Sequence, residues 1–315
     1  RFWGVSGVYT PLTPQNLATS PPIPKDPIRA LPLWGQRRGR INVVNPSSLP
    51  FKLSLPNVKH ILTIASGKGG VGKTTVSVNL ALALSQAGQR VGLFDADLYG
   101  PNVPIMLGVR RLGKTKGYIP VARRERAAYV PPLERFGLKV MSIGLLVGEK
   151  DTLLPDTRFT GHIIRQTLQD VQWGELDYLL VDFPPGSGEP QQTLLKTISF
   201  DGVIVVTTPQ DLSLLDAGRS LGLFRQNGIP ILGLVENMSY LICPHCGEKV
   251  EVFHRSPHDW AIEDEAVMLG RIPMDIAISR GIDKGHPLMQ DSPEAVQAAA
   301  FREIAARVVE YFNHA

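Results

Sequence analysis

The stretch "GKGGVGKT", residues 67–74, decides the fold. It fits the pattern G-x-x-x-x-G-K-[ST], a phosphate-binding loop that lies between a strand and a helix. The apolar run "HILTIA" (60–65) precedes it and is typical of a buried parallel strand. Apolar residues at helical spacing follow in "TTVSVNLALALSQAG" (74–88), where Gly88 is placed to end the helix. The flanking sequence therefore agrees with the motif.

Strand patterns and helical patterns alternate along the rest of the chain. Apolar runs predict strands at 90–97, 139–143, 177–183, 201–209 and 230–237. Helical spacing predicts helices at 157–172, 190–199, 213–227 and 292–312, the last of them capped by Ser292. Alternation of this kind predicts an α/β fold with a doubly wound, mostly parallel sheet. The segment "VARRERAA" (121–128) predicts a solvated insertion.

The N-terminal segment differs from the rest in charge and in proline content. Residues 1–60 contain eight Lys or Arg, one acidic residue and 10 of the 26 prolines. The sequence therefore predicts a basic leader without regular structure at residues 1–57 and a P-loop ATPase domain with a C-x-x-C motif at residues 58–315. An Arg-rich, acid-poor leader is typical of a mitochondrial transit segment. A flexible basic tail is the alternative.

Charge and hydropathy argue against two kinds of partner. After residue 60 the chain carries 25 Lys or Arg and 28 Asp or Glu, with no basic stripe, so we expect no nucleic-acid partner. No apolar run approaches the roughly 20 residues that span a bilayer, so we expect no stable membrane insertion.

The phosphate-binding motif predicts roles for its own residues and for one distant carboxylate. Its backbone N–H groups and the helix N-terminus favour a polyphosphate. Lys73 is expected to reach the β- and γ-phosphates, and the Thr74 hydroxyl is expected to bind Mg²⁺. Asp182 ends an apolar strand, as the second Mg²⁺-binding residue of such sites does. The predicted nucleotide-binding residues of this segment are Gly67, Gly69, Gly70, Val71, Gly72, Lys73, Thr74 and Thr75.

Lys68 is not required for binding one nucleotide. It resembles the signature lysine of the deviant Walker-A ATPases, the superfamily of MinD, ParA and the nitrogenase iron protein. In that superfamily the lysine crosses a dimer interface to the partner's nucleotide, so the resemblance implies that Lys68 is catalytic together with Lys73. A charge supplied in trans is worth about 10³–10⁵ in the rate of phosphoryl transfer. A solvated surface lysine is the alternative.

The stretch "DADLYGP" (95–101) matches the next motif of the same superfamily. The resemblance implies that Asp97 orients or activates the attacking water and that Asp95 supports Mg²⁺. Asn237, at the end of a predicted strand, matches the position that reads adenine. This match implies ATP as the nucleotide.

The stretch "CPHC", residues 243–246, holds both cysteines of the chain. Two incidental thiols and a redox pair are alternatives, although a redox C-x-x-C usually opens a helix. A metal site needs four ligands. A Cys₂His₂ zinc site with His254 and His258 is conceivable, but Pro257 disfavours the usual helix. Two copies of the motif across a two-fold axis supply four thiolates, which suit [4Fe–4S] or zinc.

Six stretches together resemble the Mrp/NUBPL family of P-loop ATPases. The resemblance covers about residues 57–312 and implies a homodimer that binds a [4Fe–4S] cluster at Cys243 and Cys246 and delivers it to apo-proteins. The stretches are "ASGKGGVGKTT", "DADLYGPNVP", "LDYLLVDFPPGSG", "TTPQDLSLLDA", "ENMSYLICPHCG" and "LGRIPMD".

Within the family, three features favour the mitochondrial, NUBPL-like branch. They are the acid-poor leader, the lack of a four-cysteine N-terminal motif and the lack of a folded N-terminal domain. This branch implies a location in the mitochondrial matrix and clients among the subunits of respiratory complex I, with a cytoplasmic location as the alternative. The family's G-T-G-D reads "GSGE" here, and its glycine-rich stretch after the cysteines is replaced by "FHRSPHDW".

We therefore expect an ATP-binding iron–sulfur cluster carrier with slow ATP hydrolysis coupled to cluster transfer. The coupling is expected to run through switch segments 97–104 and 183–189. The alternatives are a positioning ATPase of the ParA/MinD type and an ATPase dimer clasped by zinc.

Overall fold

The computed structural model describes residues 52–53, 55–97, 100–109, 122–124, 127–145, 157–186, 188–243, 245–253 and 266–314. All of them belong to one compact unit, Pro46–Ala315. Most of the predicted leader, His254 and His258, and the side chains of the "VARRERAA" segment lie outside the described residues.

A large twisted sheet forms the centre of the domain. Within the described residues it has nine strands, in the order β10-β9-β8-β1-β7-β2-β6-β5, with β11 paired to β9. Its strands are β1 (Val58–Ala65), β2 (Val91–Asp95), β5 (Leu133–Arg135), β6 (Leu138–Ser142), β7 (Leu176–Asp182), β8 (Gly202–Thr207), β9 (Ile231–Ile242), β10 (Lys249–Val250) and β11 (Met268–Met274). The short strands β3 (Ala122–Arg124) and β4 (Ala127–Tyr129) pair separately.

The pairing confirms the predicted doubly wound, mostly parallel sheet. The central strands are parallel, and the antiparallel pairs β5–β6 and β9–β10 lie toward its two edges. From β1 the chain passes through a helix to β2 on one side, while β8 and β9 lie on the other side. In sheets of this kind ligands bind outside the carboxyl ends of the strands, near the point where the winding reverses.

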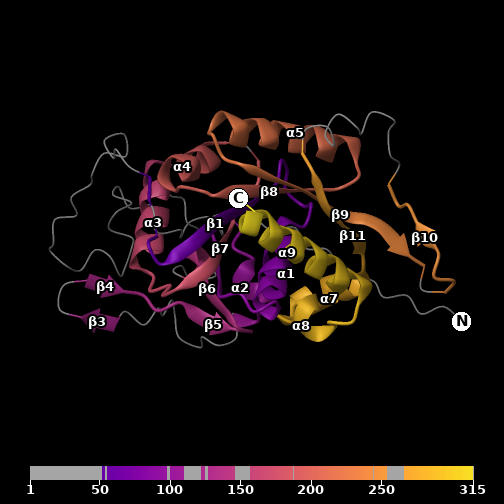
Figure 1. Ribbon diagram of the computed structural model, residues 1–315, viewed down its shortest axis with the longest axis horizontal. Helices are drawn as coiled ribbons and strands as arrows, with labels where there is room; N and C mark the ends of the chain where they lie inside the picture. The colour runs from indigo at the N-terminus through magenta and orange to yellow at the C-terminus, as the bar shows by residue number, and fades with distance from the viewer. Residues whose placement is uncertain are drawn as a thin grey trace, which may run out of the picture. The chain divides into compact units, whose positions relative to one another are not determined.

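Helices cover both faces of the sheet (Figure 1). Their bounds are α1 (Lys73–Gln86), α2 (Val103–Met106), α3 (Thr157–Asp170), α4 (Glu189–Thr197), α5 (Asp211–Gln226), α7 (Ile276–Lys284), α8 (Leu288–Asp291) and α9 (Val296–His314). One apolar core joins the sheet to α1 and α9, and the other joins it to α3, α4 and α5. Along β1, Leu62 and Ile64 enter the first core, whereas Ile61 and Ala65 enter the second.

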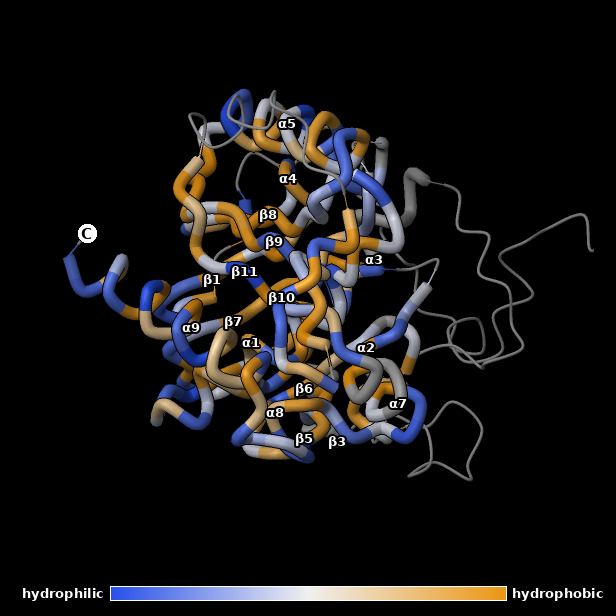
Figure 2. Tube along the Cα trace, turned by 90° about the vertical axis from the view of Figure 1, so that its right-hand side faces the viewer, coloured by the Kyte–Doolittle hydropathy of each residue, from blue (hydrophilic) through white to orange (hydrophobic). Residues whose placement is uncertain are grey.

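This double burial explains why the strands read as continuous apolar runs rather than as alternating patterns. Figure 2 shows hydrophobic residues along β8 and β9 in the middle of the domain, while α5 and α9 carry both hydrophilic and hydrophobic residues.

Helix α1 is buried along twelve consecutive residues, Lys73–Leu84. It ends as predicted, because Gly88 takes the left-handed conformation with φ of 85° and its N–H donates to the Ser85 carbonyl.

Two boundaries differ by more than two residues from the sequence-based expectation. The prediction that Ser292 caps the last helix is wrong, because its N–H donates to the Leu288 carbonyl at 2.8 Å and closes α8, so that α9 begins at Val296. Strand β9 continues to Ile242, five residues beyond the predicted end, because it gains β10 and β11 as neighbours. Among the described residues, no helix is long and apolar enough to span a bilayer.

Candidate functional site

Parallel register brings the key acidic residues together at the carboxyl edge of the sheet. Asp182 on β7 is the register partner of Ile64 on β1 and of Asp95 on β2. Asp95 is in turn the partner of Ser142 on β6. Because Ile64 precedes the phosphate-binding loop by only a few residues, this register places both carboxylates beside the loop.

The loop itself, Gly67–Thr74, is shaped by contacts from two other elements. A Cβ at Gly67 would lie 2.0 Å from the backbone oxygen of Asp216 on α5, so only glycine allows this approach. Gly72 has φ of 83°, and a Cβ there would lie 2.2 Å from the Asn237 amide nitrogen. No side chain caps the helix that follows, so the first N–H groups of α1 face the loop and suit an anion.

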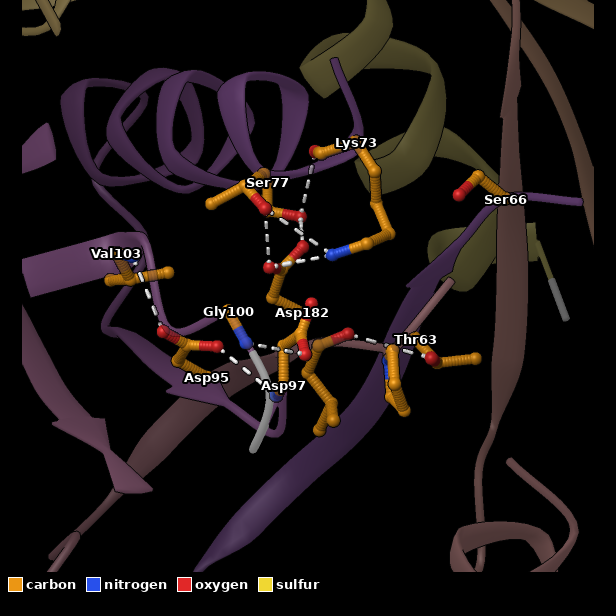
Figure 3. A network of polar contacts seen from close by, with 12 residues as sticks. Thr63, Ser66, Lys73, Ser77, Asp95, Asp97, Gly100, Val103 and Asp182 are labelled. Atoms are coloured by element: carbon orange, nitrogen blue, oxygen red, sulfur yellow. Dashed lines mark hydrogen bonds and ion pairs between the residues drawn. The ribbon is translucent and has the colours of Figure 1, made fainter. Parts of the chain in front are cut away.

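Lys73 and Asp182 form the centre of a buried polar network (Figure 3). The Lys73 Nζ lies 2.7 Å from Asp182 Oδ2, and the side chains are 7% and 0% exposed. The Thr74 hydroxyl donates to the same Oδ2 at 2.8 Å. Three residues predicted to bind phosphate and Mg²⁺ therefore converge on one point. Hydroxyl and carboxylate oxygens are the ligands that Mg²⁺ prefers, so the residues fit the ion.

Ser77 belongs to this network and was missed by the sequence analysis. Its hydroxyl donates to Asp182 Oδ1 at 2.6 Å, while Thr74 and Lys73 contact the other oxygen. The signal was available in principle, because Ser77 follows Lys73 by four residues and so shares its face of α1. A polar residue in an otherwise apolar stretch of buried helix needs a partner.

Asp95 is directed mainly toward the segment that follows it. Its carboxylate accepts hydrogen bonds from the Asp97 N–H at 3.1 Å, the Val103 N–H at 3.2 Å and the Ser142 hydroxyl at 3.0 Å. Burial, reinforced by the charge of Asp182, raises the pKa of Asp95 to about 7. The role in supporting Mg²⁺ stays a prediction, and these contacts add a second task, which is to shape the loop that carries Asp97.

Asp97 lies at the mouth of the same site. Its side chain is buried, and its Oδ1 accepts from the Gly100 N–H at 3.1 Å (Figure 3). The carboxylate therefore has a defined position two residues beyond the strand end. Its role toward a water molecule stays a prediction.

The loop after Asp182 is held at two points. The Gly186 N–H donates to the Ser66 carbonyl at 3.1 Å, which ties this loop to the end of β1. The Gln191 side-chain amide donates to the carbonyls of Pro184, at 3.2 Å, and Pro185. The sequence analysis did not single out Gln191, which fixes the predicted switch segment from the helix behind it.

Lys68 points away from the phosphate-binding centre of its own chain. Its Nζ donates to Gln210 Oε1 at 3.3 Å, immediately before α5. Leu212 and Leu215, in the first turns of α5, are 71% and 63% exposed. Lys68 therefore borders an exposed apolar pair at the carboxyl edge of the sheet.

Asn237 contacts the loop directly. Its Nδ2 donates to the Val71 carbonyl at 2.9 Å, and its side chain is buried. The predicted contact with adenine stays untested, but the amide nitrogen has a partner in the protein.

The cysteines lie in the hairpin between β9 and β10. The Cys243 N–H donates to the Glu248 carbonyl, and the Gly247 N–H donates to the Cys243 carbonyl, both at 2.9 Å. Hydrogen bonds from the backbone N–H groups of Cys246 and His245, and from the Cys246 thiol, lower the pKa of Cys243. Cys243 is partly exposed and Cys246 is exposed. Such N–H groups directed at a sulfur stabilise a thiolate, the form that binds metal.

The hairpin supplies only two of the ligands that a metal site needs. In the described part of the chain, no three His, Cys, Asp or Glu side chains gather into a group that could hold a metal ion. The alternative site with His254 and His258 involves residues outside that part.

Comparison with known proteins agrees with this arrangement. The model of the family "NUBPL iron-transfer P-loop NTPase" matches residues 57–309. The iron-sulfur cluster carrier protein of Synechocystis is 42% identical over 263 residues, covering 83% of this chain and 73% of that protein.

Solved structures are similar over the same part of the chain. The nucleotide-binding protein of Archaeoglobus fulgidus in complex with ADP has a TM-score of 0.62 and 31% identity, covering 76% of this chain and 95% of that one. MinD of Pyrococcus horikoshii with Mg-ADP has a TM-score of 0.59 and 26% identity, covering 81% and 98%. The chain has the fold of MinD-like P-loop NTPases, and it belongs to the family of NUBPL iron-transfer P-loop NTPases.

Proposed function

We propose that this protein is an ATP-binding carrier that holds a [4Fe–4S] cluster between two subunits and delivers it to apo-proteins. The observation that carries the proposal is the cysteine hairpin, in which a turn closed by the Gly247 N–H and the Cys243 carbonyl holds both thiols at the end of β9 in a chain of this family. The iron-sulfur cluster carrier of Synechocystis, similar over most of the chain, supports the same cargo.

A homodimer follows from the number of sulfur ligands. Each chain contributes Cys243 and Cys246, whereas the cluster requires four ligands, so two hairpins are needed. The surface around Lys68 suits a second copy, because Leu212 and Leu215 share one face of α5 and are largely exposed. Both features lie at the carboxyl edge of the sheet, so one two-fold axis could serve both.

The nucleotide site supports slow ATP hydrolysis. Water attacks the γ-phosphorus, the bond to the bridging oxygen of ADP breaks, and the water's proton passes to Asp97. Mg²⁺ held by Thr74 and Asp182 supplies charge neutralisation for the phosphates. Lys73 holds the phosphates, and Lys68 of the second subunit completes the site. Hydrolysis is slow because the site is incomplete until the dimer closes and brings this second lysine to the nucleotide.

Hydrolysis is proposed to act on the cluster through the segments that flank the nucleotide. Asp95 holds the N–H groups of Asp97 and Val103, and Gln191 holds the loop after Asp182. A change at the phosphates would move these contacts together, which supports coupling of hydrolysis to transfer.

Delivery to subunits of respiratory complex I in the mitochondrial matrix is the finer part of the proposal, with the cytoplasm as the alternative location. Its support is the acid-poor leader of residues 1–57. The carrier protein of Synechocystis supports the cargo rather than the client.

The test is metal analysis of protein purified without oxygen. We expect about four irons per dimer and complete loss of iron in Cys243→Ala, because one remaining thiolate per chain leaves two of four ligands. The variant should bind Mg-ATP as the unmodified protein does, because the hairpin lies outside the phosphate-binding contacts.

Two other outcomes would decide for the alternative functions. Zinc in place of iron would favour a zinc-clasped dimer. Binding to DNA or to anionic liposomes that weakens with salt would favour a positioning ATPase. A monomer that holds a complete cluster would contradict the proposal outright.

A further inference from the structure

Strand β9 connects the phosphate-binding loop to the cysteine hairpin. Its first half pairs with β8, from Ile231 to Glu236. It also pairs with β11, from Leu234 to Leu241, and beyond the end of β8 its last two residues pair with β10. The strand therefore runs past the loop and ends one residue before Cys243.

The first contact of this extension is with the loop. The Nδ2 of Asn237 donates to the Val71 carbonyl at 2.9 Å, and Asn237 is 5% exposed. The space that a Cβ of Gly72 would occupy is filled by the same Nδ2. An amide nitrogen so placed supports the backbone of two loop residues, Val71 and Gly72.

The next residue interrupts the strand. Met238 has φ of 55°, a left-handed conformation that is unfavourable for a residue with a side chain and persists where neighbours impose it. Between Asn237 and Leu241, β9 advances four residues while β11 advances two, from Ile272 to Met274.

A hydrogen bond to β11 holds this interruption of β9 in place. The hydroxyl of Ser239, which is buried, donates to the Ile272 carbonyl at 3.0 Å. The bulge thus has a constraint on β11 and another on the loop through Asn237. A local shift of the loop would be passed to the hairpin rather than absorbed in a flexible turn.

We propose that Asn237 is a positioning residue for the phosphate-binding loop, and that β9 transmits the state of the loop to the cysteine hairpin. The second part rests on the proposed function, because it concerns the cysteines as cluster ligands. This route from the nucleotide to the cysteines runs along β9 and bypasses both predicted switch segments, 97–104 and 183–189.

The first experiment separates positioning from base recognition. Binding of Mg-ATP and competition by inorganic tripolyphosphate, which has no base, are measured for the unmodified protein, Asn237→Ala and Asn237→Asp. We expect both variants to weaken tripolyphosphate binding about tenfold, as for a lost buried hydrogen bond, and to weaken ATP binding at least as much. Weakened ATP with unchanged tripolyphosphate would overturn the positioning role, and so would no change in either.

A matched control removes a similar contact elsewhere. Asn227 follows α5 and donates its Nδ2 to the Leu223 carbonyl at 2.8 Å, at the opposite end of that helix from Lys68. Asn227→Ala should leave both binding constants unchanged. A comparable loss in this variant would mean that the effect reflects general destabilisation and would overturn the assignment.

The second experiment examines the route in cluster-free protein. Backbone hydrogen exchange over residues 239–250 and the rate of thiol labelling by an aromatic disulfide are measured with and without a saturating non-hydrolysable ATP analogue. We expect the analogue to change the labelling rate about threefold or more in the unmodified protein and not in Asn237→Ala. An equal change in both proteins, or none in either, would overturn the route.

The two proposals fail in distinguishable ways. Failure of the labelling experiment removes the route through β9 and leaves cluster binding intact, because no cluster is present in it. Absence of iron in the reconstituted dimer removes cluster binding and leaves the role of Asn237 at the phosphate-binding loop intact.

Discussion

The nucleotide centre and the cysteine hairpin lie at the carboxyl ends of strands of one sheet but differ in how complete they are. Lys73, Thr74, Ser77 and Asp182 are buried and contact one another within a single chain. The hairpin is partly exposed and offers two thiols. One chain can therefore organise most of a phosphate site but only half of a cluster site.

Under the proposed function, this difference indicates where the second subunit is needed. A buried carboxylate and ammonium require partners in their own chain, because an unpaired buried charge is costly. Exposed thiols and the partly exposed Lys68 have no such requirement and are available to another protomer. The chain thus separates what must be formed on folding from what is formed on assembly.

The largest expected effect tests whether the nucleotide centre is complete without the partner. Lys68→Ala should lower the kcat of ATP hydrolysis by about 10³, because the charge supplied in trans is lost. The dissociation constant of Mg-ATP should change little, since Lys68 Nζ contacts Gln210 rather than the phosphate-binding residues of its own chain. Steady-state kinetics and equilibrium titration measure the two quantities.

The control for this prediction is Lys196→Ala, which removes an exposed lysine from the last turn of α4. It should leave kcat unchanged. If Lys68→Ala hydrolyses ATP at the rate of the unmodified protein, the nucleotide centre is complete within one chain and the contrast with the hairpin is sharper than proposed.

A smaller effect is expected inside the nucleotide centre. Ser77→Ala removes the hydroxyl that holds Asp182 Oδ1 at 2.6 Å. Loss of a residue that orients a metal-binding carboxylate typically costs 10–100-fold in affinity, so we expect the Mg²⁺ concentration for half-maximal hydrolysis to rise about tenfold. Activity measured over a range of Mg²⁺ concentrations gives the value, and saturating Mg²⁺ should restore most of kcat.

Thr63→Val provides the comparison for Ser77. The Thr63 hydroxyl is also buried, but it donates to the Val181 carbonyl at 3.4 Å and not to a carboxylate. The Mg²⁺ requirement should be unaffected in this variant. An equal rise in both variants would show that the effect comes from loss of any buried hydroxyl in this core rather than from the contact with Asp182.

Much of the fold and part of the site could be predicted because their signals are local. The phosphate-binding loop is contiguous, and Asp182 is recognisable as a polar residue that ends an apolar run. The parallel register then made the approach of Asp95 and Asp182 a consequence of the fold rather than of a further motif.

What escaped prediction depends on contacts between distant segments. Ser77 reads as an ordinary position of a helix until Asp182 is placed opposite it. Asn237 reads as a strand end, yet β9 runs on to Ile242 because β10 and β11 pair with it. Serine is a residue type that often caps helices, but the N–H of Ser292 donates to the preceding turn. Local patterns specify which residues are polar, not which partners they find.

The smallest expected effect concerns a region remote from both sites, and it tests whether the stability of the domain is independent of them. His60 on β1 stacks on Phe312 of α9, with ring centroids 4.1 Å apart, and contacts Tyr178. Burial lowers the pKa of His60, and Lys59 acts in the same direction, whereas Asp201 and Asp177 oppose it. The neutral ring is therefore the form that the folded domain favours.

The contribution of His60 should be present above pH 6.5, the pKa of an unfolded histidine, and lost as the pH falls through the lower pKa of the folded state. Between pH 7.5 and 5.5, we expect His60→Phe to lose less free energy of unfolding than the unmodified protein. The difference should be under about 1 kcal/mol, because the ring is partly exposed and its charge is screened. Urea unfolding of cluster-free protein at both pH values measures it.

Since Phe312 lies on α9 and away from the phosphate-binding loop, a saturating ATP analogue should raise the stability of both proteins equally and leave the difference unchanged. A difference that disappears with nucleotide would couple α9 to the loop and contradict the separation of the two sites from the rest of the core.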